Sequence, residues 1–388
     1  MDIYDTLLRW AADQGIELHG ISPQQIAGRG IGLVATRPLQ KSSTLLTVPT
    51  SCLRTLNTVP YRIRQPFPKD APVHGVLAAS LALDALAPNP HFTAWNAVVP
   101  SRASLLSSLP IAWPSALLPF LPQPALDLLA KQSANFARDW ALFQAHPLFP
   151  RAGVTPSITR IDYLYHWLLV NTRTFYHDLS WSTSTRLPAG DRMALQPVAD
   201  LFNHADAGCG VAFDEEQFII SADRDYDEGE ELFISYGAHG NDFLLVEYGF
   251  VLERNRWDEV ELDEVLLPEL TKRQKGLLEE KGFLGNYVLD AETECFRTQV
   301  AVRLLSMPLV RDWERFVDEE EEGSEEVQRR ADRILVGILR TFLDKVWAVK
   351  AELEEVTTGE EGQREMLMNR WRQIEGLLEA TIRRLEIK

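Results

Sequence analysis

The sequence is poor in cysteine and has no cysteine pair with metal-ligand spacing. Its 388 residues include three cysteines, Cys52, Cys209 and Cys295, which are far apart. An odd number of scattered cysteines argues against a disulfide framework. The absence of a Cys-x-x-Cys pair or a Cys/His cluster argues against a structural zinc site, so no metal is expected. We expect the three thiols to serve as small apolar side chains.

Long apolar runs and a basic leader are also absent. No apolar run approaches the ~18 residues that a membrane-spanning helix needs, so no membrane partner is expected. The first residues, MDIYDTLLRWAADQG, are acidic and amphipathic. A signal peptide has instead a basic segment followed by an apolar stretch. We therefore expect a soluble intracellular protein, located in the cytoplasm, the nucleus or both.

Basic residues are outnumbered by acidic ones. The chain has 39 Lys and Arg against 56 Asp and Glu, a formal net charge of −17. Such a charge argues against broad binding to a phosphate backbone, so no nucleic-acid partner is expected. The hydrophobic fraction of 45% and the charged fraction of 24% are typical of globular chains. We expect a folded monomer with more than one domain.

The negative charge is unevenly distributed along the chain. Residues 1–250 hold 24 acidic and 17 basic side chains, whereas the remaining 138 residues hold 32 and 22. This change in charge density predicts a domain boundary near Leu252, with domains at 1–252 and 253–388. Residues 214–231 contain nine acids and one base, Arg224. The run 318–326 contains seven acids and is interpreted as a solvated loop.

The two predicted domains differ in periodicity. Apolar runs between turn signals predict short strands in the first domain, at GLVAT (32–36), TLLTVP (44–49), ALQPVADLF (194–202), QFIISA (217–222) and ELFISYG (231–237). Helical spacing predicts helices over Asp2–Asp13, Ala125–Gln144 and Ile158–Thr174, the last two within a helical insert at about 81–181. After residue 265, apolar spacing of three and four predicts amphipathic helices. An α+β fold is expected.

A glycine cluster precedes the first predicted strand. It reads Gly28-Arg29-Gly30-Ile31-Gly32, followed by Leu33 and Val34. Glycines allow a tight turn and a close approach of the backbone to a ligand. A dinucleotide fingerprint would need a third glycine at Leu33 and a helix afterwards, so that interpretation is rejected. Alone, the cluster is equally typical of a plain β-turn.

A second segment, Pro197–Asp206, places polar side chains directly after a predicted strand. Asn203 and His204 lie where the chain is expected to turn. Alone, they could be turn residues whose side chains are satisfied locally. A metal site is a poorer interpretation, because no second histidine lies at a ligand spacing from His204.

A third segment contains two Tyr-Gly pairs, at Tyr236-Gly237 and Tyr248-Gly249. Alone, these pairs could be core aromatics followed by turn glycines. Together, however, GRGIGLVATRPL, ADLFNH and GEELFISYG resemble, in content and order, the motifs of SET-domain protein methyltransferases. More narrowly, the chain resembles the Rubisco large-subunit methyltransferase class and its fungal and animal relatives. That class lacks the zinc-binding cysteine clusters of many histone-directed SET domains.

The resemblance implies a particular α+β architecture. A β-rich SET domain with short-strand sheets, a helical insert and a knot-like C-terminal segment is followed by an all-α substrate-binding domain. It also implies S-adenosylmethionine as cofactor. Backbone groups of Arg29, Gly30 and Ile31 would contact this cofactor.

The same resemblance assigns further cofactor contacts. Asn203 and His204 would bind the amino-acid end and the adenine of the cofactor. Arg173 would meet its carboxylate in bidentate geometry, and the alternative is a purely structural arginine. Asp200 would hold the turn from behind, and Phe250 would pack on the adenine.

The two tyrosines are the implied catalytic residues. Tyr236 would lie against the cofactor with its hydroxyl at the reacting centre, and Tyr248 would line the lysine channel. In the implied reaction a methyl group passes from a sulfonium to a lysine amine. The amine must first lose a proton, which an apolar channel favours.

The substrate is the most open part of the resemblance. It implies a lysine of a non-histone protein, such as a ribosomal protein or a translation factor, and the acid-rich residues 214–231 favour a basic protein substrate. The alternatives are a histone lysine, a histidine acceptor, or a catalytically silent SET-fold binding protein. Arg29 departs from the acidic residue that the plant enzymes often carry in the glycine turn.

Overall fold

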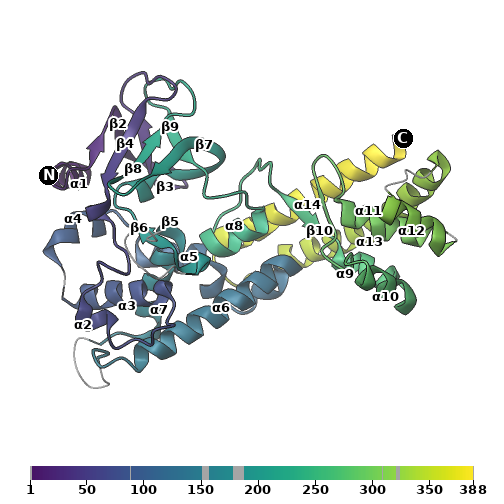
Figure 1. Ribbon diagram of the computed structural model, residues 1–388, viewed down its shortest axis with the longest axis horizontal. Coiled ribbons are helices and arrows are strands. Elements are labelled where there is room, and N and C mark those ends of the chain that lie inside the picture. Colours follow the sequence, from purple (N-terminus) through teal and green to yellow (C-terminus); the bar gives the residue numbers. More distant parts are fainter. Residues whose placement is uncertain are drawn as a thin grey trace. The chain divides into compact units, whose positions relative to one another are not determined.

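The computed structural model describes residues 2–87, 89–150, 157–177, 188–307, 309–319 and 324–387. The chain forms two compact units (Figure 1). The N-terminal unit comprises Met1–Ile111 and Ala130–Ala238, and the C-terminal unit comprises Ala112–Leu129 and His239–Lys388. Within the described ranges, no helix is long and apolar enough to cross a membrane. The domain boundary near Leu252 stays a prediction.

The N-terminal unit is built on a seven-stranded sheet with the order β1-β4-β8-β7-β9-β3-β2. Its strands are β1 (Glu17–Leu18), β2 (Ile21–Ile26), β3 (Gly30–Ala35), β4 (Thr44–Pro49), β7 (Asn203–Phe213), β8 (Gln217–Ser221) and β9 (Glu231–Ile234). All neighbouring strands are antiparallel except β7 and β9, which are parallel. Segments far apart in the sequence therefore lie side by side (Figure 1). The strands predicted around residues 32, 44, 217 and 231 are confirmed as β3, β4, β8 and β9.

The strand predicted over residues 194–202 is confirmed only at its start. Strand β6 covers Met193–Leu195 and pairs with β5 (Thr174–Tyr176). Pro197 then removes a backbone donor, and Val198 has a φ of +71°. A 3₁₀ turn follows at Ala199–Leu201. The second half of the predicted strand is therefore wrong, because an apolar composition does not reveal this backbone reversal.

The turn predicted at Asn203 and His204 is also wrong. These residues begin β7, where they pair with Phe233 and Ile234 of β9. The register then shifts, because both His204 and Cys209 align with Ile234. The bulge brings Gly208 so close to β9 that a Cβ there would lie 2.4 Å from the Phe233 carbonyl oxygen. Only glycine fits this position without a backbone shift.

Gly208→Ala is expected to destabilise the protein by about 1–3 kcal/mol, the usual cost of overpacking. The clash is with backbone atoms, which cannot rotate away as a side chain can. Gly210→Ala is a matched control on the same strand, since a Cβ there would meet only the Ser221 carbonyl oxygen, 3.9 Å away. Chemical denaturation of both variants measures the difference. Equal free energies of unfolding would contradict the proposed contact.

The described residues of the N-terminal unit also form several helices. They are α1 (Ile3–Asp13), α2 (Tyr61–Arg64), α3 (Val73–Leu86), α4 (Thr93–Asn96), α5 (Arg102–Ser108), α7 (Arg160–Arg173) and the greater part of α6 (Gln123–Gln144). The three helices predicted before residue 181 are confirmed as α1, α6 and α7. Residues 178–181 of the predicted insert lie outside the described residues.

The helical core of this unit is held by an aromatic and polar cluster. The Trp167 indole donates to Asp139 Oδ2 at 3.0 Å, and the His74 ring stacks on Trp167 at 4.2 Å between centroids. Asp139 is buried beside Gly75, where a Cβ would lie 2.8 Å from the carboxylate carbon. Helices α3, α6 and α7 are thereby joined, and α7 ends at Arg173.

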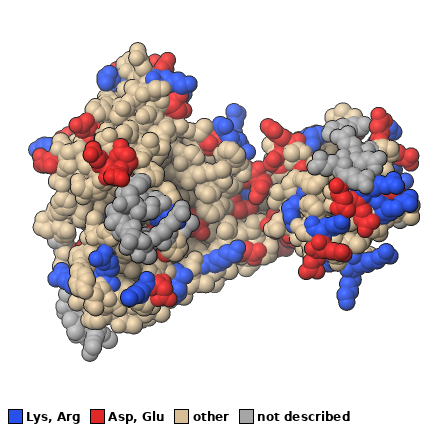
Figure 2. Space-filling model, in the orientation of Figure 1, with Lys and Arg blue, Asp and Glu red and all other residues tan. Residues whose placement is uncertain are grey.

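In the C-terminal unit, the described residues are mainly helical and include one pair of short strands. It contains α8 (Asn241–Tyr248), β10 (Glu259–Glu261), α9 (Asp263–Leu266), α10 (Lys272–Glu280), β11 (Val288–Asp290), α11 (Phe296–Ser306), α12 (Val310–Glu319), α13 (Glu325–Glu354) and α14 (Glu361–Ile387). The helices predicted after residue 265 are confirmed. Acidic and basic side chains are interspersed on the face of this unit seen in Figure 2. The ends of the predicted loop 318–326 are helical, and residues 320–323 lie outside the described residues.

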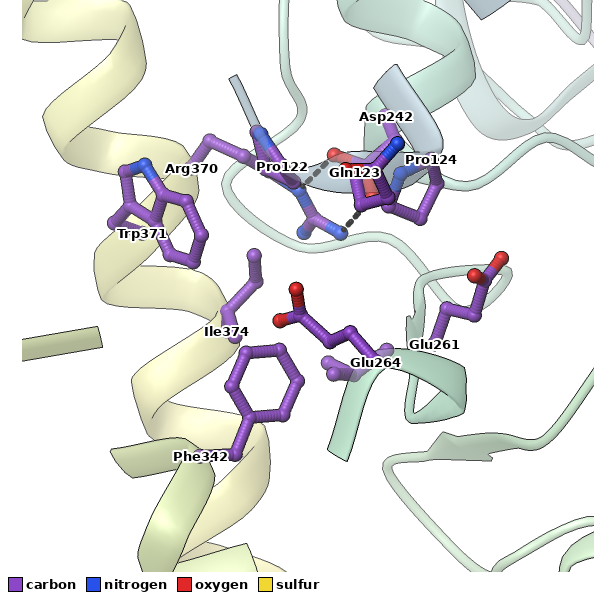
Figure 3. A pocket seen from close by; sticks show the side chains of 11 residues that line it. Pro122, Gln123, Pro124, Asp242, Glu261, Glu264, Phe342, Arg370, Trp371 and Ile374 are labelled. Carbon is purple, nitrogen blue, oxygen red and sulfur yellow. Dashed lines mark hydrogen bonds and ion pairs between the residues drawn. The ribbon is translucent and has the colours of Figure 1, made fainter. Parts of the chain in front are cut away.

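A buried ion cluster joins α14 to α8 within the C-terminal unit. Arg370 has a fully buried side chain, and its guanidinium contacts Asp242 at 2.7 and 3.0 Å and Asp258 at 2.7 Å. Burial lowers the pKa of Arg370, but the two aspartates outweigh this effect and hold the pKa above its ordinary value. Figure 3 shows the guanidinium beside Asp242 in a pocket also lined by Trp371 and Phe342.

Candidate active site

The glycine cluster forms the hairpin turn between β2 and β3. Ile26 pairs with Gly30, so that Ala27, Gly28 and Arg29 make the loop. Gly28 and Gly30 have φ values of +75° and +81°, and a Cβ at either would meet no atom within 4 Å. These two glycines are therefore required for backbone conformation rather than for space. Arg29 and Gly30 are exposed, as a turn that meets a ligand would be.

Glu231 connects this turn to the Asn-His motif. Its Oε2 accepts a hydrogen bond from Arg29 Nη1 at 2.7 Å, and its Oε1 accepts one from Asn203 Nδ2 at 2.7 Å. A Cβ at Gly32 would lie 2.8 Å from Glu231 Oε1 and 2.9 Å from Asn203 Nδ2. Gly32 thus leaves the space in which these side chains meet. Glu231 was not among the predicted site residues, although it begins the strand that leads to Tyr236.

Arg173 and Asp200 form a second, more deeply buried cluster. Arg173 Nη1 donates to the Asp200 carbonyl oxygen at 2.6 Å and to Asp200 Oδ2 at 3.1 Å. Trp95 Nε1 donates to the same Oδ2 at 3.0 Å. Burial raises the pKa of the Asp200 carboxyl, and Arg173 and Trp95 oppose that rise. Trp95 lies on α4 of the helical region, and nothing in its local sequence indicated this contact.

The turn that carries Asp200 begins at an unusual backbone position. Val198 is fully buried and has a φ of +71°, which is rare for a β-branched residue. Surrounding packing must offset the cost of this conformation. The strained residue reverses the chain between β6 and the 3₁₀ turn. Asp200 and Asn203 therefore occupy positions set by packing rather than by local preference.

Tyr236 joins the tyrosine motif to the Asn-His motif. Its hydroxyl donates to the Phe202 carbonyl oxygen at 2.8 Å, and its backbone N–H donates to His204 Nδ1 at 3.0 Å. The two rings are stacked, with centroids 4.9 Å apart. Because Nδ1 accepts a hydrogen bond, it carries no proton. The orientations of Tyr236 and His204 are thus mutually determined.

Tyr248 and Phe250 lie in the C-terminal unit, whereas all the other predicted site residues lie in the N-terminal unit. Tyr248 is the last residue of α8, which ends at Gly249 with a φ of +80°. The Tyr248 ring lies 6.2 Å from that of Phe250 and 6.4 Å from that of Phe243. Burial, with a smaller effect of Glu247, raises the pKa of Tyr248 to about 12. Its hydroxyl therefore stays protonated at neutral pH.

Comparison with known proteins identifies the fold family. A model of the SET domain matches residues 30–237, more than half of the chain. The chain belongs to the SET-domain family. A second model, of the ribosomal lysine N-methyltransferase 2 C-terminal domain, matches residues 258–384. The SET match begins at Gly30, directly after the turn loop, and contains Asn203, His204 and Tyr236.

Several known proteins are similar in sequence to this SET-domain chain. Ribosomal lysine N-methyltransferase set11 of Schizosaccharomyces pombe is 35% identical over 150 residues, 38% of each chain. SET domain-containing protein 4 of Mus musculus is 29% identical over 322 residues, 78% of this chain and 72% of that protein. Actin-histidine N-methyltransferase of Homo sapiens is 24% identical over 273 residues, 67% of this chain and 44% of that protein. The matches therefore span less than half of the first and third relatives.

Solved SET-domain structures share the fold over the whole chain. Rubisco LSMT bound to sinefungin and monomethyllysine has a TM-score of 0.64 and 15% identity, covering 100% of this chain and 94% of that one. The SET domain of LSMT bound to lysine and AdoHcy has a TM-score of 0.62 and 15% identity, covering 99% and 92%. The predicted α+β SET fold with a helical region and a helical C-terminal part is confirmed.

The residues of the N-terminal unit fit the amino-acid end of S-adenosylmethionine. Among the described residues, Arg173 Nε and Asp200 Oδ1 are buried without a hydrogen-bond partner. An unpaired buried donor is costly, and a bound carboxylate or an ordered water would satisfy it. The turn at Arg29 and Gly30 is exposed, and a Cβ at Gly30 would meet no atom within 4 Å. No group of His, Cys, Asp and Glu in the described ranges has a geometry that could hold a metal ion.

Proposed function

We propose that this SET-domain chain is an S-adenosylmethionine-dependent protein-lysine N-methyltransferase that acts on a non-histone protein. The observation that carries the proposal is the joining of two motifs at Tyr236. Its hydroxyl is held by Phe202 and its backbone by His204, directly beside Asn203. The names of relatives that methylate ribosomal lysines support the same activity.

Residues of the N-terminal unit would hold the cofactor. Arg173 would bind the carboxylate, with Asp200 orienting the guanidinium, and Asn203 would bind the amino group. Backbone groups of Arg29 and Ile31 would contact the cofactor from the turn between β2 and β3. When bound, S-adenosylmethionine supplies a methyl group that is activated by its positive sulfur.

The remaining task of the protein is to align a neutral amine with that methyl group. A free lysine has a pKa of about 10.4, and an apolar channel near a positive charge lowers it. Tyr248 keeps its own proton, so its hydroxyl would orient the amine by hydrogen bonding rather than remove a proton. Tyr236 would hold the geometry of the reacting centre, which is a proximity effect.

The proposed substrate is a basic protein, such as a ribosomal protein or a translation factor. The methyltransferase itself is proposed to act as a monomer. Residues 214–231 support a basic partner only in part. Asp225 accepts a hydrogen bond from the Lys41 backbone at 2.7 Å, and Asp223 accepts one from the Tyr226 hydroxyl at 2.6 Å. These two carboxylates therefore make hydrogen bonds within the protein. Exposed side chains such as Glu215 and Glu228 are better placed to attract a basic segment.

A histidine acceptor is a second candidate. It is favoured by the similarity to proteins named actin-histidine N-methyltransferase, which extends over 273 residues. A lysine acceptor is preferred because the C-terminal match is to a ribosomal lysine N-methyltransferase domain. An intracellular location is part of the same proposal.

Methyl labelling of a cell extract tests the proposed function. The purified chain is incubated with methyl-labelled S-adenosylmethionine and extract, and labelled proteins are digested and sequenced by mass spectrometry. We expect methyl-lysine in a non-histone protein. The Asn203→Ala variant, assayed in parallel, is expected to label at least about tenfold less at limiting cofactor, because one polar contact to the cofactor is lost.

Each outcome of that labelling is informative. Methyl-histidine would overturn the lysine acceptor, and a labelled histone would overturn the non-histone substrate. No labelled protein in extracts from several sources, with a chain that binds the cofactor, would favour a silent SET-fold binding protein.

A further inference from the structure

We propose that Glu231 is a positioning residue that determines which end of the Asn203 amide faces the cofactor. The inference rests on the proposed function, because it assumes that Asn203 binds the amino-acid end of S-adenosylmethionine. It begins from the contact between Asn203 Nδ2 and Glu231 Oε1 at 2.7 Å. Glu231 lies in the GEELFISYG motif, but no cofactor contact was predicted for it.

The chemistry of the two groups allows only one arrangement. An ionised carboxylate accepts hydrogen bonds and donates none. The Asn203 amide must therefore direct its nitrogen, not its oxygen, at Glu231. Because the amide is planar, Oδ1 then points in the other direction and is left to accept a hydrogen bond. A cationic amino group is the partner that such an acceptor favours.

The surroundings of Glu231 hold its carboxylate in the orientation that faces the Asn203 amide. Its side chain is 13% exposed, and its second oxygen is paired with Arg29 Nη1 at 2.7 Å. The Arg29 guanidinium also lies 5.4 Å from the centroid of the Phe233 ring. Arg29 therefore occupies the Glu231 oxygen that does not face Asn203. The arrangement also gives a role to Arg29, whose side chain is 54% exposed.

The surrounding backbone leaves little room for another arrangement. Asn203 aligns with Phe233 across β7 and β9, and Glu231 aligns with Val34 across β9 and β3. Gly32 on β3 lies beneath the contact, where a Cβ would come within 3 Å of both side chains. Three neighbouring strands thus hold the carboxylate and the amide together.

Reversing the hydrogen bond tests the proposal. In Asn203→Asp, two carboxylates would face each other, and affinity for S-adenosylhomocysteine should fall by about tenfold or more. In Glu231→Gln, the new side chain can still accept through its oxygen, so we expect a loss of about threefold or less. In the double variant, the introduced amide nitrogen can donate to the introduced carboxylate, whose other oxygen is then free to accept from the amino group. The double variant should bind within about threefold of Glu231→Gln.

Calorimetry with two ligands separates positioning from general damage. Methylthioadenosine has the adenosine part of the cofactor but no amino-acid end. Its affinity should be the same in all the variants, whereas S-adenosylhomocysteine affinity should follow the pattern above. Glu230→Gln is the matched control, since the neighbouring Glu230 pairs with Arg224 at 3.1 Å and is placed in no cofactor contact. This control should bind both ligands as the unaltered chain does.

The unfavourable outcomes are distinct. If the double variant binds S-adenosylhomocysteine no better than Asn203→Asp, Glu231 does not orient the amide. If affinity for both ligands falls together with the melting temperature, Glu231 is only structural. If the unaltered chain binds neither ligand, the proposed function itself fails.

Discussion

Tyr236→Phe is expected to lower the rate of methyl transfer by about 10²-fold or more, the usual size of losing one preorganised group at a reacting centre. The variant keeps the ring that stacks on His204 and the backbone N–H that bonds its Nδ1. It loses only the hydroxyl, which donates to the Phe202 carbonyl oxygen at 2.8 Å. Cofactor affinity should therefore stay within about threefold. Single-turnover kinetics and calorimetry measure the two quantities.

A second tyrosine in the same unit provides the control. Tyr226 is buried, and its hydroxyl donates at 2.6 Å to Asp223 Oδ1, a group that is not among the predicted site residues. Tyr226→Phe loses a comparable hydrogen bond and is expected to retain its turnover rate. A folded Tyr236→Phe variant with unchanged turnover would refute the catalytic role. A large loss of cofactor affinity would instead make Tyr236 a binding residue.

Arg370→Met is expected to lower the free energy of unfolding by about 3–5 kcal/mol, the usual cost of removing one partner from a buried ion pair. The Arg370 side chain is 0% exposed and contacts both Asp242 and Asp258 at 2.7 Å. Methionine fills a similar volume but leaves the two carboxylates buried without their cation. Chemical denaturation, monitored by the loss of helical circular dichroism, measures the change in the free energy of unfolding.

Two comparisons make this prediction specific. Arg340→Met removes an exposed arginine of α13, 64% exposed in its pair with Glu386, and should cost about 0–1 kcal/mol. Adding Asp242→Asn and Asp258→Asn to Arg370→Met should recover part of the stability, because the buried charges are then removed as well. A loss for Arg370→Met no larger than that for Arg340→Met would contradict the assigned role of the buried cluster.

The Arg370 cluster also holds the helix that ends at Tyr248. Asp242 lies in the first turn of α8, and Tyr248 is the last residue of that helix. Asn241 adds hydrogen bonds to the Leu252 carbonyl oxygen at 3.0 Å and to Gln373 at 2.9 Å. Helix α14 thus fixes the element that carries Tyr248.

Local sequence patterns predicted much of the fold. Short apolar runs predicted β8 and β9, and the glycine cluster forms the turn that its composition indicated. Helical spacing predicted α1, α6 and α7 and the C-terminal helices. These features depend on neighbours within a few residues, so a linear pattern suffices to predict them. The motif residues of the N-terminal unit were predicted from resemblance, and their contacts came from the structure.

The sequence by itself determined the elements, the family motifs and the residue types of the site. Only the tertiary structure decided that Asn203 begins a strand, that Gly208 faces a carbonyl of β9, and which side chains are partners. Glu231 with Asn203, and Trp95 with Asp200, are pairs of residues far apart in the sequence. Such contacts depend on strand order, register and a parallel pairing, which no local pattern encodes. The donors and acceptors around the proposed cofactor site are therefore a property of the assembled sheet.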